Sequence, residues 1–553
     1  MTTVPDRVPV LIVGGGPSGL AAAIELGRRG IEVLVVEPRS ALDPLRPRAK
    51  TTSVRTMEHL RRWGIADRLR EAAPLPVAHA QDVVFVTGLF GHEITRFPNA
   101  FGLWTTRQDI TPEPGQQAPQ PLVEELLREA AAELPSVTLL IGWRATSVVD
   151  GRDEARAVIE DAEGHSHVVR ATYLLGADGS SGVSRAAIGA RYEGSSGSLP
   201  NLSITFRSRA LEERPLCALG VHYWVIGARY GGLMGRLDLD GTWWAIVQGI
   251  ATDPRDADAV ELVRALAGDD IDVEVLATDP WSARLLLVDR YRGERVFLVG
   301  DAAHLNPPWG GHGFNTCVGD AVNLGWKLAA VLQGWAPESL LDSYEPERRP
   351  VALRTIDAAG GQEAFLAPSF AADELDADGP DGEALRAEVA RALQVKDPEF
   401  HSLGLVLGYD YPDSPVVVPD GTPRAEQQVT TYEPTALPGA RLPHVWLPDG
   451  SSIYDLLGDG FAVLRLGLDA STTPVSEAAT LLGMPLRVVD LVHLPRLRTL
   501  YAADLVLVRP DQHVAWRGTV VEDPEALLRH VVGVTDAPNV AAPAPSPLEE
   551  IAR

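Results

Sequence analysis

Residues 10–19, Val10-Leu11-Ile12-Val13-Gly14-Gly15-Gly16-Pro17-Ser18-Gly19, decide the fold of this 553-residue chain. An apolar strand runs into the pattern G-x-G-x-x-G and then directly into a helical run from Leu20 to Arg29. Gly14 permits the tight turn, Gly16 lets backbone N–H groups approach phosphates, and Gly19 lets helix and strand pack closely. The positive end of the helix dipole favours the same anion. The stretch therefore predicts a unit that binds a dinucleotide pyrophosphate.

A second strand, Ile31 to Val36, ends in Glu37. This carboxylate lies at the spacing of about twenty residues where an acid accepts a hydrogen bond from a ribose hydroxyl. Three glycines falling together in an ordinary turn are the alternative, but the helix, the second strand and the acid argue against it. The motif alone does not choose between FAD and NAD.

The charge balance excludes several classes of partner. Lys and Arg total 49 against 75 Asp and Glu, a formal net charge of -26. Such a surface repels phosphate backbones and anionic lipids, so we expect no nucleic acid and no membrane as partners. Cys217 and Cys317 lack metal-type spacing, which predicts no metal site and a reducing, cytoplasmic location. No apolar run reaches the length of a membrane span, and the early first strand leaves no room for a signal peptide.

Composition divides the chain into segments. Alternating strands and helices predict a discontinuous α/β nucleotide-binding domain over residues 1–75, 105–190 and 280–345. Runs rich in β-branched and aromatic residues predict an inserted sheet domain over 76–104 and 191–279. A helical segment over 346–411 and a proline-rich linker over 412–438 follow. We expect a separate α/β domain over 439–540 and a disordered Ala/Pro-rich tail over 541–553.

Two further motifs follow apolar strands: Tyr173-Leu174-Leu175-Gly176-Ala177-Asp178-Gly179, and Gly300-Asp301-Ala302-Ala303-His304 with the loop Pro307 to Asn315 and the helix Asn315 to Leu332. The set resembles the flavoprotein aromatic hydroxylases, single-component FAD monooxygenases of the p-hydroxybenzoate hydroxylase type, most closely the phenol and 2,4-dichlorophenol hydroxylase branch. The resemblance covers essentially the whole chain. It implies an α/β fold with a Rossmann-like FAD-binding domain, an inserted β-sheet substrate domain and a C-terminal thioredoxin-like domain, here without a CxxC motif.

The resemblance also implies a reaction. NAD(P)H binds transiently and reduces bound FAD, O2 adds to form a flavin C4a-hydroperoxide, and one oxygen atom passes to a small aromatic substrate. The substrates implied are phenols or hydroxy-heteroaromatics such as pyridinols, in natural-product tailoring or in aromatic catabolism, and we favour tailoring. The protein can be a homo-oligomer.

Site residues carry over position by position. Asp301 is expected to hydrogen-bond a ribityl hydroxyl, with a turn cap as the alternative. Pro308 and Arg48 are the expected catalytic residues, because the Pro308 carbonyl can meet the transferable hydroxyl and Arg48 touches the flavin. Gly182 and Ser184 stand where the family usually shows serine and valine. The residues expected to contact FAD are Gly14, Gly16, Pro17, Ser18, Gly19, Glu37, Arg39, Arg48, Gln120, Arg144, Ala145, Asp178, Asp301, Pro308, Gly311, Gly313, Phe314 and Asn315.

The inserted sheet offers aromatic side chains that can wall a flat substrate. Of the candidates on its strands, which include Trp244, we expect His222, Trp224, Arg236 and Trp243 to contact the ring. Plain core packing is the alternative for each of them. His304 is expected to organise its loop and Cys317 to be a small packed residue.

Two rival functions share the FAD-binding fold. A flavin halogenase needs a lysine and a tryptophan-rich motif, and Trp243-Trp244-Ala245-Ile246 does not reproduce that motif. A catalytically silent FAD-binding scaffold protein is the second rival, and the intact loop from Pro307 to Asn315 argues against it.

Overall fold

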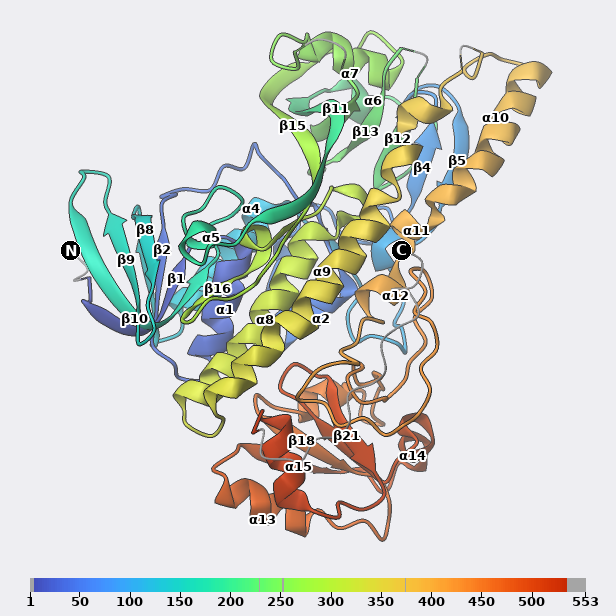
Figure 1. Ribbon diagram of the computed structural model, residues 1–553. Helices are drawn as coiled ribbons and strands as arrows, with labels where there is room; N and C mark the ends of the chain where they lie inside the picture. The colour runs from blue at the N-terminus through green and yellow to red at the C-terminus, as the bar shows by residue number, and fades with distance from the viewer. Residues whose placement is uncertain (1–3, 228, 251–252, 373, 535–553) are drawn as a thin grey trace, which may run out of the picture.

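The computed structural model describes residues 4–227, 229–250, 253–372 and 374–534 (Figure 1). Figure 1 shows a nucleotide-binding sheet, an inserted sheet above it and a C-terminal domain below, with two long helices, α8 and α9, running between them. The predicted α/β class, with an inserted sheet and a further C-terminal domain, is confirmed. The expected tail over 541–553 lies outside the described residues.

The nucleotide-binding sheet has seven strands in the order β7-β2-β1-β10-β9-β8, with β16 also paired to β10. Strands β7, β2, β1, β10 and β16 are parallel, and β8 and β9 form an antiparallel extension. The central strands β1 and β2 are buried on both faces over most of their length, which matches their nearly continuous apolar sequence. The strands are β1 (Arg7–Val13), β2 (Val33–Glu37), β7 (Val137–Ile141), β8 (Arg144–Asp150), β9 (Ala155–Glu160), β10 (Ser166–Gly176) and β16 (Val296–Leu298).

Helices pack against this sheet and against each other. The first helix begins at Pro17 rather than at the expected Leu20, because proline occupies a first helical turn without losing a hydrogen bond. It packs on α8, which crosses the domain and reaches the C-terminal domain, where Trp326 meets Phe461. The helices are α1 (Pro17–Gly27), α2 (Val54–Trp63), α3 (Ala66–Ala72), α4 (Gln120–Ala132), α5 (Ser184–Ala187), α8 (Gly313–Leu332) and α9 (Tyr344–Gly360).

The inserted sheet has eight strands in the order β17-β15-β11-β14-β13-β12-β4-β5. One face packs against Trp309 and the segment 366–400, and the other is covered by α7. β15 continues to Val288, so the sheet extends past the expected boundary at residue 279. The elements are β4 (Val83–Val86), β5 (Glu93–Phe97), β11 (Tyr192–Arg207), α6 (Ala210–Glu213), β12 (His222–Ile226), β13 (Gly231–Arg236), β14 (Thr242–Gln248), α7 (Ala259–Ala267), β15 (Glu274–Val288) and β17 (His304–Leu305). A two-stranded pair, β3 (Thr51–Thr52) and β6 (Gln116–Gln117), lies apart from it.

The C-terminal domain has the predicted thioredoxin-like arrangement. Its sheet order is β19-β18-β20-β21, with β18 and β19 parallel and the other pairs antiparallel. The short helices α10 (Pro380–Ala392), α11 (Asp397–Phe400) and α12 (Leu403–Val406) precede it, and residues 412–438 hold no helix or strand. The elements of the domain are β18 (Phe461–Arg465), α13 (Thr473–Leu481), β19 (Leu486–Asp490), α14 (Pro495–Tyr501), β20 (Leu505–Val508), β21 (Val514–Gly518) and α15 (Pro524–Val531).

A buried ionic cluster joins the C-terminal domain to α2. The Glu58 carboxylate accepts hydrogen bonds from Arg55 Nη1 at 2.7 Å, Arg441 Nε at 3.1 Å and Thr111 Oγ1 at 2.8 Å. Arg441 also donates to Tyr432 Oη at 2.9 Å. Burial raises the pKa of Glu58, but the two guanidinium groups outweigh this and hold the pKa below its ordinary value. The cluster therefore stays ionised and fixes the position of the domain.

Replacing Arg441 with methionine tests this cluster. Removing one partner leaves Glu58 with an under-compensated buried charge, and we expect the free energy of unfolding to fall by about 3 kcal/mol. Urea unfolding followed by tryptophan fluorescence measures the change. Arg68→Met, which removes an exposed pair with Glu129 and Glu133, is the control and is expected to cost less than about 1 kcal/mol. Equal losses in the two variants would contradict a special role for Arg441.

Candidate functional site

A cavity of about 590 Å³ opens where the parallel strands of the nucleotide-binding sheet end. We call it the cofactor cavity. Its lining brings together residues that are distant in sequence: Gly14, Gly16, Pro17, Ser18, Glu37, Arg39, Arg48, Gln120, Arg144, Ala145, Asp178, Asp301, Gly313 and Phe314. Of the residues expected to contact FAD, Gly19, Pro308, Gly311 and Asn315 are not part of this lining.

Two glycines of the turn, Gly14 and Gly19, lie too close to neighbouring backbone for any side chain. Gly14 has φ +107°, and a Cβ atom there would lie 2.2 Å from the Ala177 carbonyl oxygen. A Cβ on Gly19 would lie 1.9 Å from the Gly14 carbonyl oxygen, so Gly19 packs behind the turn instead of lining the cavity. Gly16 differs, because its added Cβ would meet only Arg39 Nη2, at 3.9 Å. The N-terminus of α1 is therefore open toward the cavity, as a pyrophosphate requires.

Glu37 is held in place at the end of β2. One carboxylate oxygen accepts the Gly15 N–H at 2.7 Å, and the other accepts the Arg39 N–H at 2.9 Å and Arg39 Nε at 2.7 Å. Arg39 reaches on to Glu124. Each carboxylate oxygen has more than one acceptor position, so Glu37 retains capacity to bind a ribose hydroxyl.

Asp178 also lines the cofactor cavity. Its Oδ2 accepts the Ser184 N–H at 2.9 Å, whereas its Oδ1 is buried and has no hydrogen-bond partner among the described residues. Burial raises the pKa of this carboxyl group. A Cβ on Gly182 would lie 2.0 Å from the Asp178 carboxyl carbon, so the unusual glycine makes room for the acid. Arg185 meanwhile stacks on Tyr192, with 4.3 Å between the guanidinium carbon and the ring centre.

Asn315, in the first turn of α8, connects this helix to residues 51–53 and to the glycine loop. Its Oδ1 accepts the Ser53 N–H at 2.9 Å, and its Nδ2 donates to the carbonyl oxygens of Thr51 at 3.0 Å and Gly311 at 2.7 Å. These bonds use both N–H donors of the amide and one of the two acceptor positions of its oxygen. Asn315 therefore positions the glycine loop from outside the cavity lining.

A second cavity, of about 300 Å³, lies against the inserted sheet. We call it the aromatic cavity. Side chains alternate between the two faces of a strand, and the face that carries Trp244 and Ile246 on β14 lines it, together with Ser203 and Thr205 on β11. Trp281 on β15 lines it too and donates from Nε1 to Ser203 Oγ at 2.9 Å. The opposite wall consists of Leu45, Arg46, Pro47, Arg48, Lys50, Asn306 and Pro308.

The two cavities adjoin, because Arg48 and Asn306 line both of them. Arg48 has φ +46°, a strained conformation for a residue with a side chain. The Oδ1 atom of Asn306 lies 2.9 Å from His304 Nδ1, and His304 Nε2 lies 2.8 Å from Asp320. The Asn306 Nδ2 atom is buried and has no partner among the described residues. His304 therefore orients Asn306 and lines neither cavity.

The side chains expected to contact the ring do not line the aromatic cavity. Trp243 points to the opposite face of β14, where its Nε1 donates to Glu212 at 2.8 Å, and Arg236 also pairs with Glu212. Trp224 is fully buried and stacks on Phe85. These three side chains pack within the sheet domain and line neither the cofactor nor the aromatic cavity, and their contact with a substrate ring stays a prediction.

His222 lies behind the cavity wall, 5.0 Å from the Trp244 ring and 5.2 Å from the Phe101 ring, measured between ring centres. Burial lowers the pKa of His222 to about 3, so it is neutral. Sequence reasoning included Trp244 among the sheet aromatics but chose its neighbour Trp243, because the choice of face needs the strand register. It missed Trp281 and Lys50, for which no motif gave a signal.

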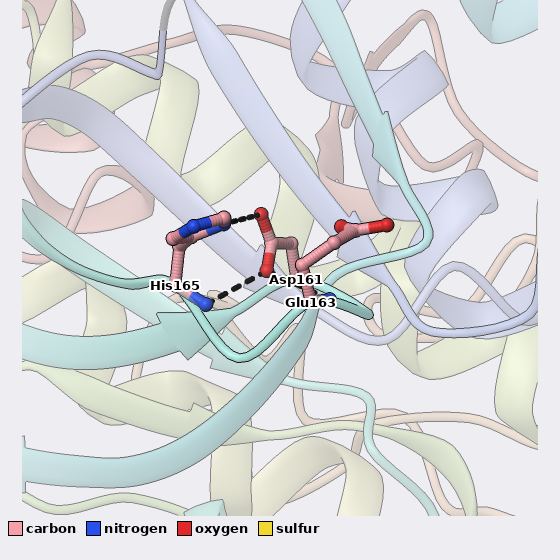
Figure 2. Close-up of side chains that lie close together, drawn as sticks. All are labelled: Asp161, Glu163 and His165. Atoms are coloured by element: carbon pink, nitrogen blue, oxygen red, sulfur yellow. Dashed lines mark hydrogen bonds and ion pairs between the residues drawn. The ribbon is translucent and has the colours of Figure 1, made fainter.

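Figure 2 shows a third group, Asp161, Glu163 and His165, at the exposed turn between β9 and β10. Asp161 Oδ1 accepts the Glu163 N–H at 3.0 Å and the His165 N–H at 2.8 Å, and Oδ2 lies 2.9 Å from His165 Nδ1. These bonds close the turn. None of the three residues lines the cofactor or the aromatic cavity.

Comparisons with known proteins agree with this geometry. The family described as FAD binding domain matches residues 7–359, and the family described as aromatic-ring hydroxylase, C-terminal, matches residues 435–538. The chain is 35% identical to a 4-methyl-5-nitrocatechol 5-monooxygenase from a Burkholderia species, over 96% of this chain and 97% of that protein. It is 31% identical to a phenol 2-monooxygenase from Pseudomonas sp. (strain EST1001), over 95% of this chain and 92% of that protein.

A solved structure of RebC with bound 7-carboxy-K252c superposes with a TM-score of 0.87 and 36% identity, over 96% of this chain and all of that chain. Among the residues described, no helix is both long and apolar enough to cross a membrane. The FAD-binding family covers more than half of the chain, the hydroxylase family covers its C-terminal domain, and the relatives match almost end to end. The chain therefore belongs to the FAD-dependent aromatic-ring hydroxylases.

Proposed function

We propose that this monooxygenase hydroxylates a phenol or a hydroxy-heteroaromatic ring bound in the aromatic cavity, with NAD(P)H and O2 as co-substrates. The observation that carries the proposal is the junction between the two cavities at Arg48 and Asn306. A ring in one cavity lies beside a group held in the other. Relatives named for nitrocatechol and phenol support a phenolic substrate.

The cofactor cavity has donors and acceptors that fit FAD. We assign the pyrophosphate to the open N-terminus of α1 at Gly16, the adenosine ribose to Glu37 and the ribityl chain to Asp301. Gly313 and Phe314, at the N-terminus of α8, would hold the flavin pyrimidine, where the helix dipole favours negative charge. FAD, when bound, supplies the electron transfer and oxygen activation that no side chain provides.

The chain itself orients the ring and excludes water. Trp244 and Trp281 both lie within the cavity lining and give it aromatic walls that suit a flat substrate. The loop that carries Arg48 is tied to the sheet, because Thr205 Oγ1 donates to the Leu45 carbonyl oxygen at 2.9 Å and Arg46 pairs with Asp279 at 2.5 Å. Pro308 closes the same wall, and we assign its carbonyl group to the hydroxyl that is transferred.

We also propose a cytoplasmic location, supported by two free cysteines, Cys217 and Cys317. A homo-oligomer stays a prediction, which light scattering of the purified enzyme tests. The natural-product relatives, which include a putative polyketide hydroxylase from Streptomyces halstedii at 32% identity, favour a role in tailoring.

Product analysis separates hydroxylation from the two rival functions. Incubation of the FAD-loaded enzyme with NADPH, 18O2 and a panel of phenols and pyridinols should yield a product with one added 18O atom, detected by mass spectrometry. A product with an added halogen in the presence of halide would establish a flavin halogenase. Stable FAD binding with no product across the panel would establish a silent scaffold.

Gly16→Ala tests the pyrophosphate assignment. An added Cβ meets no protein backbone, so the melting temperature of the apoprotein should stay unchanged. The methyl group occupies the open helix N-terminus, and we expect FAD affinity to fall by about tenfold or more. Quenching of flavin fluorescence measures the affinity. Gly361→Ala, whose added Cβ meets nothing closer than 3.4 Å at the end of α9, is the matched control, and wild-type FAD affinity in both variants would refute the assignment.

Ala277→Trp tests the aromatic cavity. Ala277 lines the cavity from β15, and an indole there fills space that the ring needs. FAD affinity should stay at the wild-type value, while hydroxylation of the best substrate falls by about a hundredfold or more, because the ring is excluded from the reacting position. Arg284→Trp places the same side chain at an exposed position of the same strand and should leave hydroxylation unchanged. If Ala277→Trp hydroxylates the substrate at the wild-type rate, the substrate does not bind in this cavity.

A further inference from the structure

Lys50 is the unusual member of the aromatic cavity lining. Its ammonium nitrogen lies 4.2 Å from the centre of the Trp244 ring and donates to the Arg48 carbonyl oxygen at 2.9 Å. An ammonium group has three N–H donors, and these contacts use one donor and one face of a ring. Lys50 therefore has unused hydrogen-bonding capacity next to the ring that would wall the substrate.

No carboxylate compensates the charge of Lys50 within the described part of the chain. Asp279 is the single acid in the cavity lining, and Arg46 already pairs with it at 2.5 Å. Arg48 also has no side-chain ion pair among the described residues. The lining thus carries three cationic side chains against one carboxylate, in a chain whose formal net charge is -26. This local excess of positive charge favours an anionic ligand.

The surroundings make the uncompensated charge costly. Burial lowers the pKa of Lys50 to about 8, and no neighbouring acid raises it. His222, whose ring centre lies 5.0 Å from that of Trp244, is neutral and offers no counter-charge. An anionic oxygen placed against Lys50 would supply the missing partner, and in a cavity with low polarity a charge-assisted hydrogen bond is stronger than in water.

We propose that Lys50 binds the ionised hydroxyl of the aromatic substrate, so that this enzyme selects acidic phenols and takes them as phenolates. This inference rests on the proposed function, because it places the ring in the aromatic cavity. When the hydroxyl ionises, its proton is released to the solvent, and the bound anion retains both electrons of the O–H bond. A phenolate ring is richer in electrons than the neutral phenol, which suits it to accept an electrophilic oxygen.

The test uses 4-nitrophenol, whose visible absorbance distinguishes phenolate from phenol. Difference spectra of the oxidised FAD-loaded enzyme, recorded with and without ligand and without NAD(P)H, give the pKa of the bound ligand. We expect this pKa to lie about one unit or more below that of free 4-nitrophenol, equivalent to about tenfold tighter binding of the anion. The other charged groups that face the ligand are Arg46, Arg48 and Asp279, and they are unchanged in all variants.

Lys50→Met and Lys50→Gln should abolish the lowered ligand pKa and weaken binding by about tenfold, whereas Lys50→Arg keeps the charge and should retain most of both effects. Lys396→Met is the matched control, because Lys396 is a buried lysine 4.4 Å from the Trp224 ring centre that pairs with Glu399 and lies outside the aromatic cavity. Thermal melting and FAD content verify that each variant is folded. A lysine that only anchors the Arg48 carbonyl would not change the ligand pKa.

Three results would overturn the inference: an unchanged ligand pKa in Lys50→Met, binding of 4-nitrophenol as the neutral phenol, or no saturable binding by the wild-type enzyme. If the wild type still binds FAD and adds one 18O atom to a phenol, only the role of Lys50 fails. If the wild-type enzyme does not bind FAD, or hydroxylates no phenol, the proposed function itself is refuted.

Discussion

The structure depends on the close approach of loops at one edge of the nucleotide-binding sheet. Strands β1, β10 and β16 are parallel, so the turns that follow them meet at their carboxyl ends. The turn at Gly14 contacts the Ala177 backbone, and an added Cβ on Gly300 would lie 2.3 Å from Ser18 Oγ. Side chains larger than hydrogen would separate these turns. Their contact creates the cofactor cavity and places two helix N-termini, those of α1 and α8, on the same side of it.

The inserted sheet forms a second cavity, the aromatic cavity, beside the cofactor cavity. Its long strands β11 and β15 carry one polar and aromatic face to the loop that contains Arg48 and Lys50. Thr205 and Asp279 hold that loop against the sheet. The aromatic cavity therefore lies between this loop and the inserted sheet. The loop supplies its positive charge, and the sheet supplies its aromatic walls.

Buried ion pairs connect the remaining parts. The cluster around Glu58 joins α2 to the C-terminal domain, and Glu347 on α9 accepts hydrogen bonds from Lys327 at 2.7 Å and Arg509 at 2.6 Å. Neither cluster lines the cofactor cavity or the aromatic cavity. They fix α8 and α9 against the C-terminal domain, and α8 in turn carries Gly313 and Phe314 to the cofactor cavity. The C-terminal domain, which has no CxxC motif, thus contacts the helix whose first turn lines the cofactor cavity.

The sequence by itself determined the dinucleotide unit, the α/β class and the family, because glycine spacing and apolar strands are local properties that one turn or one strand encodes. It also identified residues that meet around the cofactor cavity, since each follows a strand whose direction the pattern predicts. Only the tertiary structure decided which face of β14 lines the aromatic cavity, and it is the face that carries Trp244 and not Trp243. Strand register and the packing of the loop at Lys50 depend on contacts between residues far apart in the chain, and no local pattern records those contacts.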